Sequence, residues 1–395
     1  MGKKLVCKVD RNGDLMHRVY LQADVDLSKI KTDIMKEDTV DVLPDDATVA
    51  EKVLEGFPVP PEYIGFYLVD SNKFNIGGQE IDEQFGVWMH IWNELTLPAE
   101  HEKGFKEMVG LREKDFGSQK DNDGPANNNL PFDKAGMKTL YVPFQFWFNR
   151  NPGLALPLIA LQYHEVKFEV FMATAESLLN DEFTVTDSSG AEKQRMVGVE
   201  KGFLAEASLW VDYVYLDTDE RRRFAQNSHE YLIEQVQFTG DEQMQNKVPV
   251  NFNHPVKELV WLVYGDVAGT AQDQEGDFTK AKILLNSQDR FTEREPRYFN
   301  LVQPYQHHTR IPAGDDGPND TASRALRNVR DHLYLYSFSL KPEDHQPSGS
   351  CNFSRIDTSQ LKFTNANRQK YIKLFARSYN VLRVMSGLGG LAFSS

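Results

Sequence analysis

The sequence is divided into many short apolar or alternating runs, and Pro and Gly occur in almost every interval between them. Alternation with a period of two predicts β-strands that are buried on one face. Helical periodicity is confined to three short pieces, 47–54, 81–95 and 320–329. Many short strands without long helices are typical of sandwiches and barrels, and they exclude a parallel α/β fold. The predicted strands are 4–9, 15–25, 63–69, 140–148, 158–171, 209–216, 231–238, 259–264, 280–285, 333–340, 360–363 and 372–385.

The first two of these runs are separated by the segment 10–14, which contains Asn12 and Gly13. An Asn-Gly pair readily takes the positive φ angles of a two-residue hairpin turn. The pattern therefore predicts that the runs 4–9 and 15–25 pair with each other as adjacent antiparallel strands.

A faint repeat divides the chain into two halves. The segment 74–82 is echoed by 283–291, and each is followed by a polar insertion, at 99–136 in the first half and 306–330 in the second. At 395 residues the chain also exceeds the size at which a single hydrophobic core stops growing. We therefore predict two copies of one β fold, with the charged stretch 217–223 at their junction.

Charge and cysteine content exclude several classes of protein. The formal net charge of −14 argues against a surface that neutralises many phosphates, although Arg221, Arg222 and Arg223 form a local basic patch, so direct binding to nucleic acid is not expected. Cys7 and Cys351 are the only cysteines, which excludes a disulfide framework and a cysteine zinc site. No window approaches the roughly 20 apolar residues of a membrane span, and the first residues lack a signal peptide pattern. These features predict a soluble protein made in the cytosol, without membrane insertion.

The sequence offers few groupings of residues that carry out chemistry. The histidine pair 307–308 and the His-Glu pair 164–165 come nearest to metal ligands, but neither has a second cluster at ligand spacing, so we interpret them as loop or strand-surface residues. The segment 121–124 resembles a calcium loop, yet Leu130 occupies the position of the bidentate acid. The glycines at 387–390 are expected to allow tight packing or a turn. We therefore predict no catalytic residue, no metal ligand and no cofactor.

Two further features are the glycosylation sequons and a run of aromatic residues. Asn319 and Asn352 each begin a glycosylation sequon, although synthesis in the cytosol disfavours its ordinary use. An aromatic run could stack on bases or sugars, but alternating aromatics more often fill a sandwich core. We predict that this run is core; its members are Tyr141, Phe144, Phe146, Trp147 and Phe148.

Several segments are more specific than strand periodicity. The segment 151–166, NPGLALPLIALQYHEV, closely resembles a segment of the major capsid proteins of nucleocytoplasmic large DNA viruses, especially those of the chlorella-virus and related algal-virus branch. Further segments resemble the same proteins in the same order along the chain. They lie at 210–213, 229–235, 251–255, 303–305, 346–357 and 379–392.

This resemblance implies an all-β fold made of two consecutive eight-stranded jelly rolls with short helices in loops. The first jelly roll is expected over residues 1–216, a linker over 217–229 and the second jelly roll over 230–395. The resemblance further implies a structural protein of the virion, not an enzyme, that forms a homotrimer with a pseudo-hexagonal outline, the capsomer. Its implied partners are neighbouring capsomers, which tile the icosahedral shell of a large double-stranded DNA virus, and minor capsid proteins beneath the shell. Synthesis is expected in the host cytoplasm.

Two departures from the family pattern keep alternatives open. Family members usually carry an amino-terminal arm before the first strand, whereas here the first predicted strand begins within the opening residues, and the segment 28–62 is longer and more charged than in relatives. A minor or vertex capsid component of the same fold is therefore a second interpretation. A jelly-roll carbohydrate-binding protein is a third, although the sequence offers no ligand pocket. The insertions 99–136 and 174–205 are expected on the outer face, where their deletion would leave the fold intact.

Overall fold

The first half of the chain forms a β-sandwich of two antiparallel sheets. One sheet has the strand order β1-β8-β4-β5, over Lys4–Lys8, Val166–Met172, Val69–Ile76 and Gln79–Phe85. The other has the order β11-β2-β6, over Leu204–Val214, Leu15–Asp26 and Met137–Pro143, and the short strand β7 (Leu156–Pro157) pairs with β2. Apolar side chains of both sheets bury one continuous core between them. A small separate sheet joins β3 (Ile30–Ile34), β10 (Glu192–Val199) and β9 (Asp181–Thr186).

The second half forms another sandwich with its own core. One sheet has the order β13-β19-β15-β16, over Lys247–Pro249, Ser359–Thr364, Lys280–Leu285 and Gln288–Asp289. The other has the order β12-β20-β14-β17, over His229–Gln243, Lys370–Met385, Pro255–Gly265 and Leu333–Ser337. Strand β18 (Cys351–Asn352) pairs with β14, and β21 (Leu388–Leu391) pairs with β20.

Short helices connect these strands. The α-helices are α2 (Ile64–Tyr67), α3 (Gly86–Thr96), α4 (Ala99–Val109), α5 (Trp147–Arg150), α7 (Thr218–Gln226) and α8 (Gln303–His307). Single turns of other helix types are η1 (Leu27–Lys29), η3 (Pro152–Leu154), η5 (Tyr298–Val302) and η7 (Phe353–Arg355). Of the helices described, none is long and apolar enough to span a membrane.

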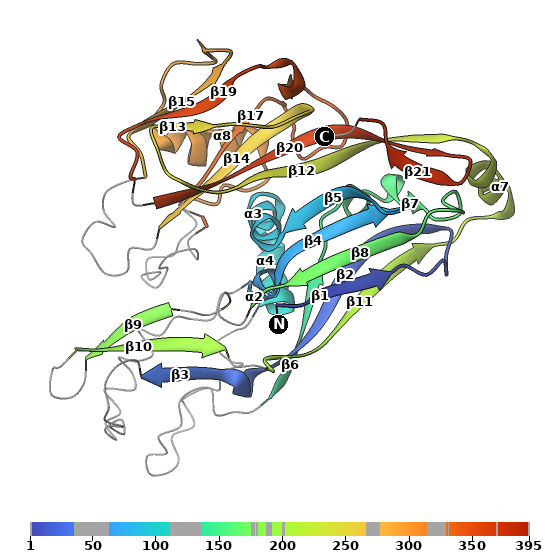
Figure 1. Ribbon diagram of the computed structural model, residues 1–395, viewed down its shortest axis with the longest axis horizontal. Helices are drawn as coiled ribbons and strands as arrows, with labels where there is room; N and C mark the ends of the chain where they lie inside the picture. The colour runs from blue at the N-terminus through green and yellow to red at the C-terminus, as the bar shows by residue number, and fades with distance from the viewer. Residues whose placement is uncertain are drawn as a thin grey trace.

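The structure is a computed structural model that describes residues 2–34, 63–110, 136–174, 178, 181–186, 192–199, 202–265, 277–313, 329–330, 332–368 and 370–393. The four large sheets lie in layers: the sheet with β15 and β19 is at the top of Figure 1, and the sheet with β2 and β11 is near the bottom. The two inner layers meet where β5 approaches β12 (Figure 1). The two sandwiches therefore face each other through one sheet from each.

The two halves are structural copies of each other, as the repeat predicts. The order β1-β8-β4-β5 matches β13-β19-β15-β16, and β11-β2-β6 matches β20-β14-β17, with β7 and β18 in equivalent places. Even the hairpin turns agree, because Gly77 and Gly78 have φ angles of 59° and 86°, and Asn286 and Ser287 have 49° and 63°. Beside the turns, the Lys73 to Glu80 and Lys282 to Asp289 ion pairs both have an N to O distance of 2.9 Å.

The predicted hairpin at Asn12 and Gly13 is wrong. Strand β1 pairs with β8 and β2 pairs with β11, so the chain crosses from one sheet to the other at this point. The guanidinium of Arg11 donates to the main-chain carbonyl oxygen of Gln162 over 2.8 Å, and a Cβ at Gly13 would lie 2.5 Å from Cβ of Tyr213. Neither Asn12 nor Gly13 has the positive φ of a tight turn. Contacts with distant residues, rather than the local pair, set the path of the chain.

Other boundaries also differ from the sequence predictions. The predicted strand 63–69 is largely helix α2, and the predicted helix 81–95 begins as strand β5 before α3 starts at Gly86. The insertion 99–136 begins with helix α4, whose Val109 is buried in the first core, so deletion of the whole insertion would remove core packing. The predicted helix 47–54 and residues 320–328 of the third predicted helix lie outside the described residues.

The start of helix α3 depends on a glycine. A Cβ at Gly86 would lie 2.2 Å from the carbonyl oxygens of both Phe66 and Val69. Such a contact with the main chain can be relieved only by moving the helix or the preceding segment. Gly86 therefore fixes where α3 leaves the sheet.

We expect Gly86→Ala to lower the free energy of unfolding by roughly 1–3 kcal/mol, because the added methyl group forces the backbone apart. Gly104→Ala is the matched control, since a Cβ at Gly104, in the interior of α4, meets no atom within 4 Å. It should raise the free energy of unfolding by about 0.5–1 kcal/mol through helix propensity. Urea unfolding at one protein concentration measures both, and equal effects of the two variants would contradict the close packing at Gly86.

Candidate functional site

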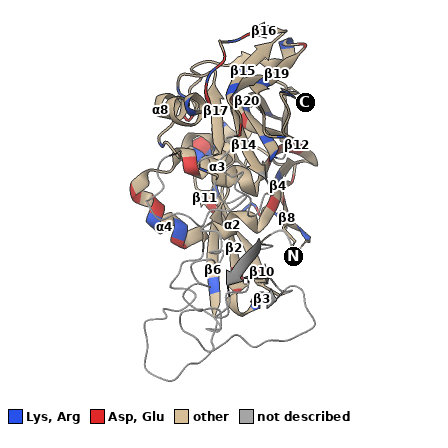
Figure 2. Ribbon diagram, turned by 90° about the vertical axis from the view of Figure 1, so that its left-hand side faces the viewer, with Lys and Arg blue, Asp and Glu red and all other residues tan. Residues whose placement is uncertain are grey.

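The two sandwiches meet along helix α3, which belongs to the first half and packs on the second. Its side chains at 88, 91, 92 and 95 share one helical face. They cover the outer face of the sheet that contains β14, β17 and β20, and Figure 2 shows charged residues of α3 and α4 beside this contact. The apolar contact comprises Trp88, Ile91, Trp92 and Leu95 with Val260, Leu262, Leu333, Leu335 and Phe375.

A cluster of buried charges adjoins this contact, and Arg377 of β20 lies at its centre. The side chain of Arg377 is 2% exposed. Its guanidinium donates to Glu234 over 2.6 Å and to Glu258 over 2.8 Å, and its Cζ lies 3.9 Å from the ring centre of Trp92. One cation is therefore shared by two carboxylates of the second half and an aromatic ring of the first.

Glu234, on β12, binds two further cations. The ammonium of Lys257 donates to it over 2.5 Å, and the guanidinium of Arg150, from α5 of the first half, donates over 2.6 Å. Burial raises the pKa of Glu234, but the charges of Arg377, Arg150 and Lys257 outweigh it and hold that pKa well below its usual range. The ionised carboxylate thus ties the second half to the first.

The cluster continues through Glu258 to His308. The imidazole Nε2 of His308 lies 2.8 Å from Glu258, and its Nδ1 lies 2.9 Å from Glu343. Burial lowers the pKa of His308, but the two carboxylates raise it to about 9. Burial likewise raises the pKa of Glu258, while His308 and Arg377 lower it to about 2. At neutral pH the imidazolium is therefore a buried cation held between two anions.

A second group of ion pairs joins the same two halves through carboxylates of α3 and α4. Glu94 of α3 is fully buried and lies 3.0 Å from Nε of Arg330. Glu102 of α4 accepts from Arg330 and from Arg310, each over 2.6 Å. Both carboxylates belong to the first half and both guanidiniums to the second, so the ion pairs cross the interface.

Hydrogen bonds also join the edges of the two inner sheets. The main-chain amide of Val236, on β12, donates to the carboxylate of Asp82, on β5, over 3.1 Å. The side-chain amide of Gln235 (Nε2) donates to the main-chain carbonyl oxygen of Ile81. Burial raises the pKa of Asp82 to about 8, although the hydrogen bond from Val236 and the charge of Arg150 oppose this. The edge strands β5 and β12 are thus linked by hydrogen bonds between a side chain of one and the main chain of the other.

This arrangement is suited to holding two bodies in one orientation. In the part of the chain that the structure describes, no group of three or more His, Cys, Asp and Glu side chains could hold a metal ion. A hollow of about 250 Å³ lies beside the charge cluster, and Arg150 and Glu234, which line it, are already paired with each other. The other lining residues are Trp147, Asn151, Pro152, Leu154, Glu343, Asp344 and His345.

The residues singled out in the sequence fall in different places. Asn352 is exposed on β18, and its side-chain oxygen accepts from the main-chain amide of Ser354 over 3.1 Å. Asn319 lies outside the described residues, so glycosylation at either sequon stays a prediction. The prediction that His308 is a surface residue is wrong, because its side chain is fully buried between two carboxylates. His164 hydrogen-bonds to the main chain of Gly389.

The aromatic run is core except at its first member. Phe144, Phe146, Trp147 and Phe148 are at most 2% exposed, which confirms the prediction for them. Tyr141 is 40% exposed, so the prediction is wrong there. Alternation identifies side chains on one face of a strand but does not say whether that face is covered.

The charge cluster around Arg377 was not predicted from the sequence. Part of a signal is present, because Glu258 comes directly before the apolar run Leu259–Tyr264 and Arg377 comes directly after Leu374–Ala376. A charge at such a position is seldom buried without a partner. The partners, however, lie 119 residues apart in the chain for Arg377 and Glu258, and 143 for Arg377 and Glu234. No local pattern pairs residues over that separation.

The chain is similar to known proteins over its whole length. A family profile described as major capsid protein N-terminus matches residues 1–217, and one described as large eukaryotic DNA virus major capsid protein matches residues 220–319 and 325–390. The chain is 44% identical to the major capsid protein of Pyramimonas orientalis virus, over 100% of this chain and 87% of that protein. It is 35% identical to the major capsid protein of Paramecium bursaria Chlorella virus 1, over 83% of this chain and 79% of that protein.

Solved structures give the same likeness. A chain of the PBCV-1 virus capsid superimposes with a TM-score of 0.68 and 30% identity, covering 100% of this chain and 93% of that chain. The Faustovirus major capsid protein superimposes with a TM-score of 0.64, covering 97% of this chain and 88% of that chain. Its identity is 11%, so this second likeness concerns the fold alone.

We expect Arg377→Met to lower the free energy of unfolding by roughly 3–5 kcal/mol, because it leaves Glu234 and Glu258 buried with less compensation. Arg383→Met is the matched control on the same strand, since Arg383 pairs with Glu230 at 2.8 Å where both side chains are more than half exposed. Its effect should stay below about 1 kcal/mol. Chemical denaturation measures both variants, and a loss at Arg377 as small as that at Arg383 would contradict the role of the cluster.

The contribution of His308 should depend on pH. Its folded pKa of about 9 exceeds its ordinary value of 6.5, so protonation stabilises the fold fully below pH 6.5 and the contribution is lost as the pH rises through 9. The difference in free energy of unfolding between the wild type and His308→Gln should therefore shrink from pH 6 to pH 9.5.

Lys257, whose pKa burial lowers to about 8, titrates in both proteins, so the difference reports His308 itself. Denaturant unfolding at a series of pH values measures the two curves. Parallel curves over this range would show that His308 is not held as an imidazolium.

Proposed function

Because the chain belongs to the family of major capsid proteins of large eukaryotic DNA viruses, we propose that three copies associate into a capsomer of nearly hexagonal outline. Proteins of this family form the capsid shell, and the function of the chain is accordingly structural. The association into trimers is what we propose for this chain beyond its structural role.

The observation that carries the proposal is the duplicated sheet order of the two halves. Three chains, each with two equivalent sandwiches, place six similar bodies around a threefold axis. Such a ring approximates sixfold symmetry, so its sides can meet those of neighbouring rings in a continuous layer. A single jelly roll per chain would need six chains for the same outline.

The rigid interface between the halves supports this use. The ion pairs of Arg150 with Glu234 and of Glu94 with Arg330, together with the apolar face of α3, fix the angle between the two sandwiches. A capsomer can tile a shell only when its sides keep constant angles. The two sandwiches of one chain therefore contact neighbouring chains as a single rigid body.

We propose the domain limits 1–216 and 230–395, with 217–229 as the linker. Helix α7 supports this division, because it lies between β11 and β12 and has no buried residue. At its start Asp217 accepts from the amide of Glu220 over 2.9 Å, and Arg221 pairs with Asp14 of the first half at 3.0 Å. Strand β12 begins at His229, which is the last residue of the proposed linker.

We infer that the capsomer contacts neighbouring capsomers and minor capsid proteins beneath the shell, and that the chain is made in the host cytoplasm. The net charge of −14 supports a role without direct contact to nucleic acid. The relatives are structural proteins, which supports a chain that catalyses no reaction. They are major capsid proteins, which favours the shell protein over a vertex component or a carbohydrate-binding jelly roll.

Light scattering on the purified chain, coupled to size-exclusion chromatography, tests the trimer. We expect a mass of three 45.2 kDa chains that does not change with dilution. Negative-stain electron microscopy of the same fraction should then reveal particles with a near-hexagonal outline. A mass of one chain over the whole concentration range would contradict the proposal.

A further inference from the structure

The first sandwich has a sheet face that corresponds to the face covered by α3 in the second. Strand β7 pairs with β2 at Leu15 and Met16, and β18 pairs with β14 at Pro255 and Val256. Met16 is thereby equivalent to Val256, and both are fully buried. Counting along the two strands from these anchors gives equivalent positions on the two outer faces.

The residues on the two faces correspond one by one. Tyr20 pairs across the sheet with Trp210 and Pro143, as Val260 pairs with Phe375 and Leu335. Two positions further along, Tyr141 stands opposite Gln22 as Leu333 stands opposite Leu262. Every second-half member of this set is buried under or beside α3; the equivalent pairs are Tyr20 with Val260, Trp210 with Phe375, Pro143 with Leu335, and Tyr141 with Leu333.

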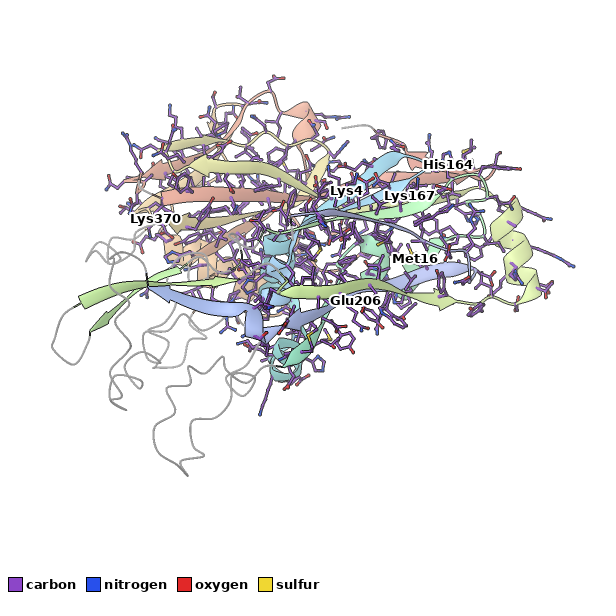
Figure 3. The ribbon with its side chains drawn as sticks, turned by 60° about the horizontal axis from the view of Figure 1, so that its bottom comes forward. Lys4, Met16, His164, Lys167, Glu206 and Lys370 are labelled. Carbon is purple, nitrogen blue, oxygen red and sulfur yellow. The ribbon has the colours of Figure 1, made fainter. Side chains whose placement is uncertain are left out.

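In the first half this face is open and aromatic. Trp210 is 52% exposed and Tyr141 is 40% exposed. The ring of Tyr20 stacks on Trp210 with centres 6.5 Å apart and meets the edge of Tyr141 at 6.0 Å. We call Tyr20, Tyr141 and Trp210 the aromatic patch. Figure 3 shows its strands β2 and β11 running side by side, with Met16 on β2 and Glu206 on β11.

The second half carries a helical segment at the same place in the chain as α3. The segment Tyr298–His307, which is η5 followed by α8, lies between the β15–β16 hairpin and β17, as α3 lies between the β4–β5 hairpin and β6. Phe299 anchors it in the second core, and the side-chain oxygen of Gln303 accepts from the amide of Ser337 over 2.9 Å. Its exposed large hydrophobic side chains are Val302, 39% exposed, and Tyr305, 75% exposed. A spacing of three residues puts both on one helical face.

We propose that the aromatic patch is covered by a second copy of this chain, whose segment Tyr298–His307 packs on it in the way that α3 packs within the chain. The contact joins two different surfaces, so it is heterologous and leaves each copy with one free surface of each kind until a ring closes. Because the intrachain and interchain contacts are equivalent, each turns the next sandwich by a similar angle. Closure after three copies then gives six sandwiches. This inference rests on the proposed trimer and names its contact surfaces.

The first test replaces the aromatic patch. The double variant Tyr20→Ser with Trp210→Asp should reduce the mass measured by light scattering from three chains to one, and Tyr305→Asp on the opposing surface should do the same. Tyr215→Asp is the matched control, since Tyr215 is 71% exposed but lies beyond the end of β11. It should leave the mass at three chains. Near-ultraviolet circular dichroism of each variant establishes that the sandwiches remain folded.

A cross-linking test does not depend on loss of assembly. In a chain with Cys7→Ser and Cys351→Ser, the pair Trp210→Cys and Tyr305→Cys should form disulfides between chains on mild oxidation, giving covalent dimers and trimers on a non-reducing gel. A chain with only one of the two new cysteines should give no covalent trimers on the same gel. Trimers that persist in the patch variants and show no cross-link would overturn this surface and leave the proposed trimer standing. A wild-type chain that is monomeric at every concentration would instead remove the trimer itself.

Discussion

The guanidinium of Arg377 lies where the parts of this molecule meet. It contacts carboxylates from β12 and β14 and the ring of Trp92 from the first half, while Glu234 reaches on to Arg150 of α5. A buried charge without partners costs several kcal/mol, so the cluster is favourable only when all of these elements are in place. Docking of the two sandwiches is thereby coupled to the correct folding of each. An apolar interface alone would tolerate sliding between the layers, whereas these hydrogen bonds permit one register.

Because the two sandwiches are duplicates, they have equivalent outer sheet faces, of which one is covered within the chain and the other is exposed. The two sandwiches agree in strand order, in the hairpin turns at 77–78 and 286–287, and in the ion pair beside each turn. They differ on one outer sheet face, where aliphatic Val260 is replaced by Tyr20 at the equivalent position. The apolar face that carries Val260 and Phe375 is sealed within the chain by α3. An aromatic face with polar tips tolerates water before assembly and still offers a large contact area afterwards.

Local sequence information accounts for much of the fold. Alternation and Pro-Gly punctuation act over a few residues, and they predict the strand 280–285 with the bounds it has and the burial of Phe144, Phe146 and Phe148. The repeat between 74–82 and 283–291 corresponds to two equivalent hairpins. The segments that match capsid proteins also identify the protein family from short stretches of the chain. These features are decided by residues close together in the chain.

By itself, then, the sequence determined the all-β class, the division into two copies and the family. Only the tertiary structure decided which strands became neighbours, since Asn12 and Gly13 carry a hairpin signal that the contacts of Arg11 with residues near 162 override. It also decided that Arg377 would meet Glu234 and that Tyr141 would remain exposed. Each outcome depends on what another part of the chain places beside the residue. Periodicity assigns a side chain to a face, but burial and ion pairing require the surface that covers it.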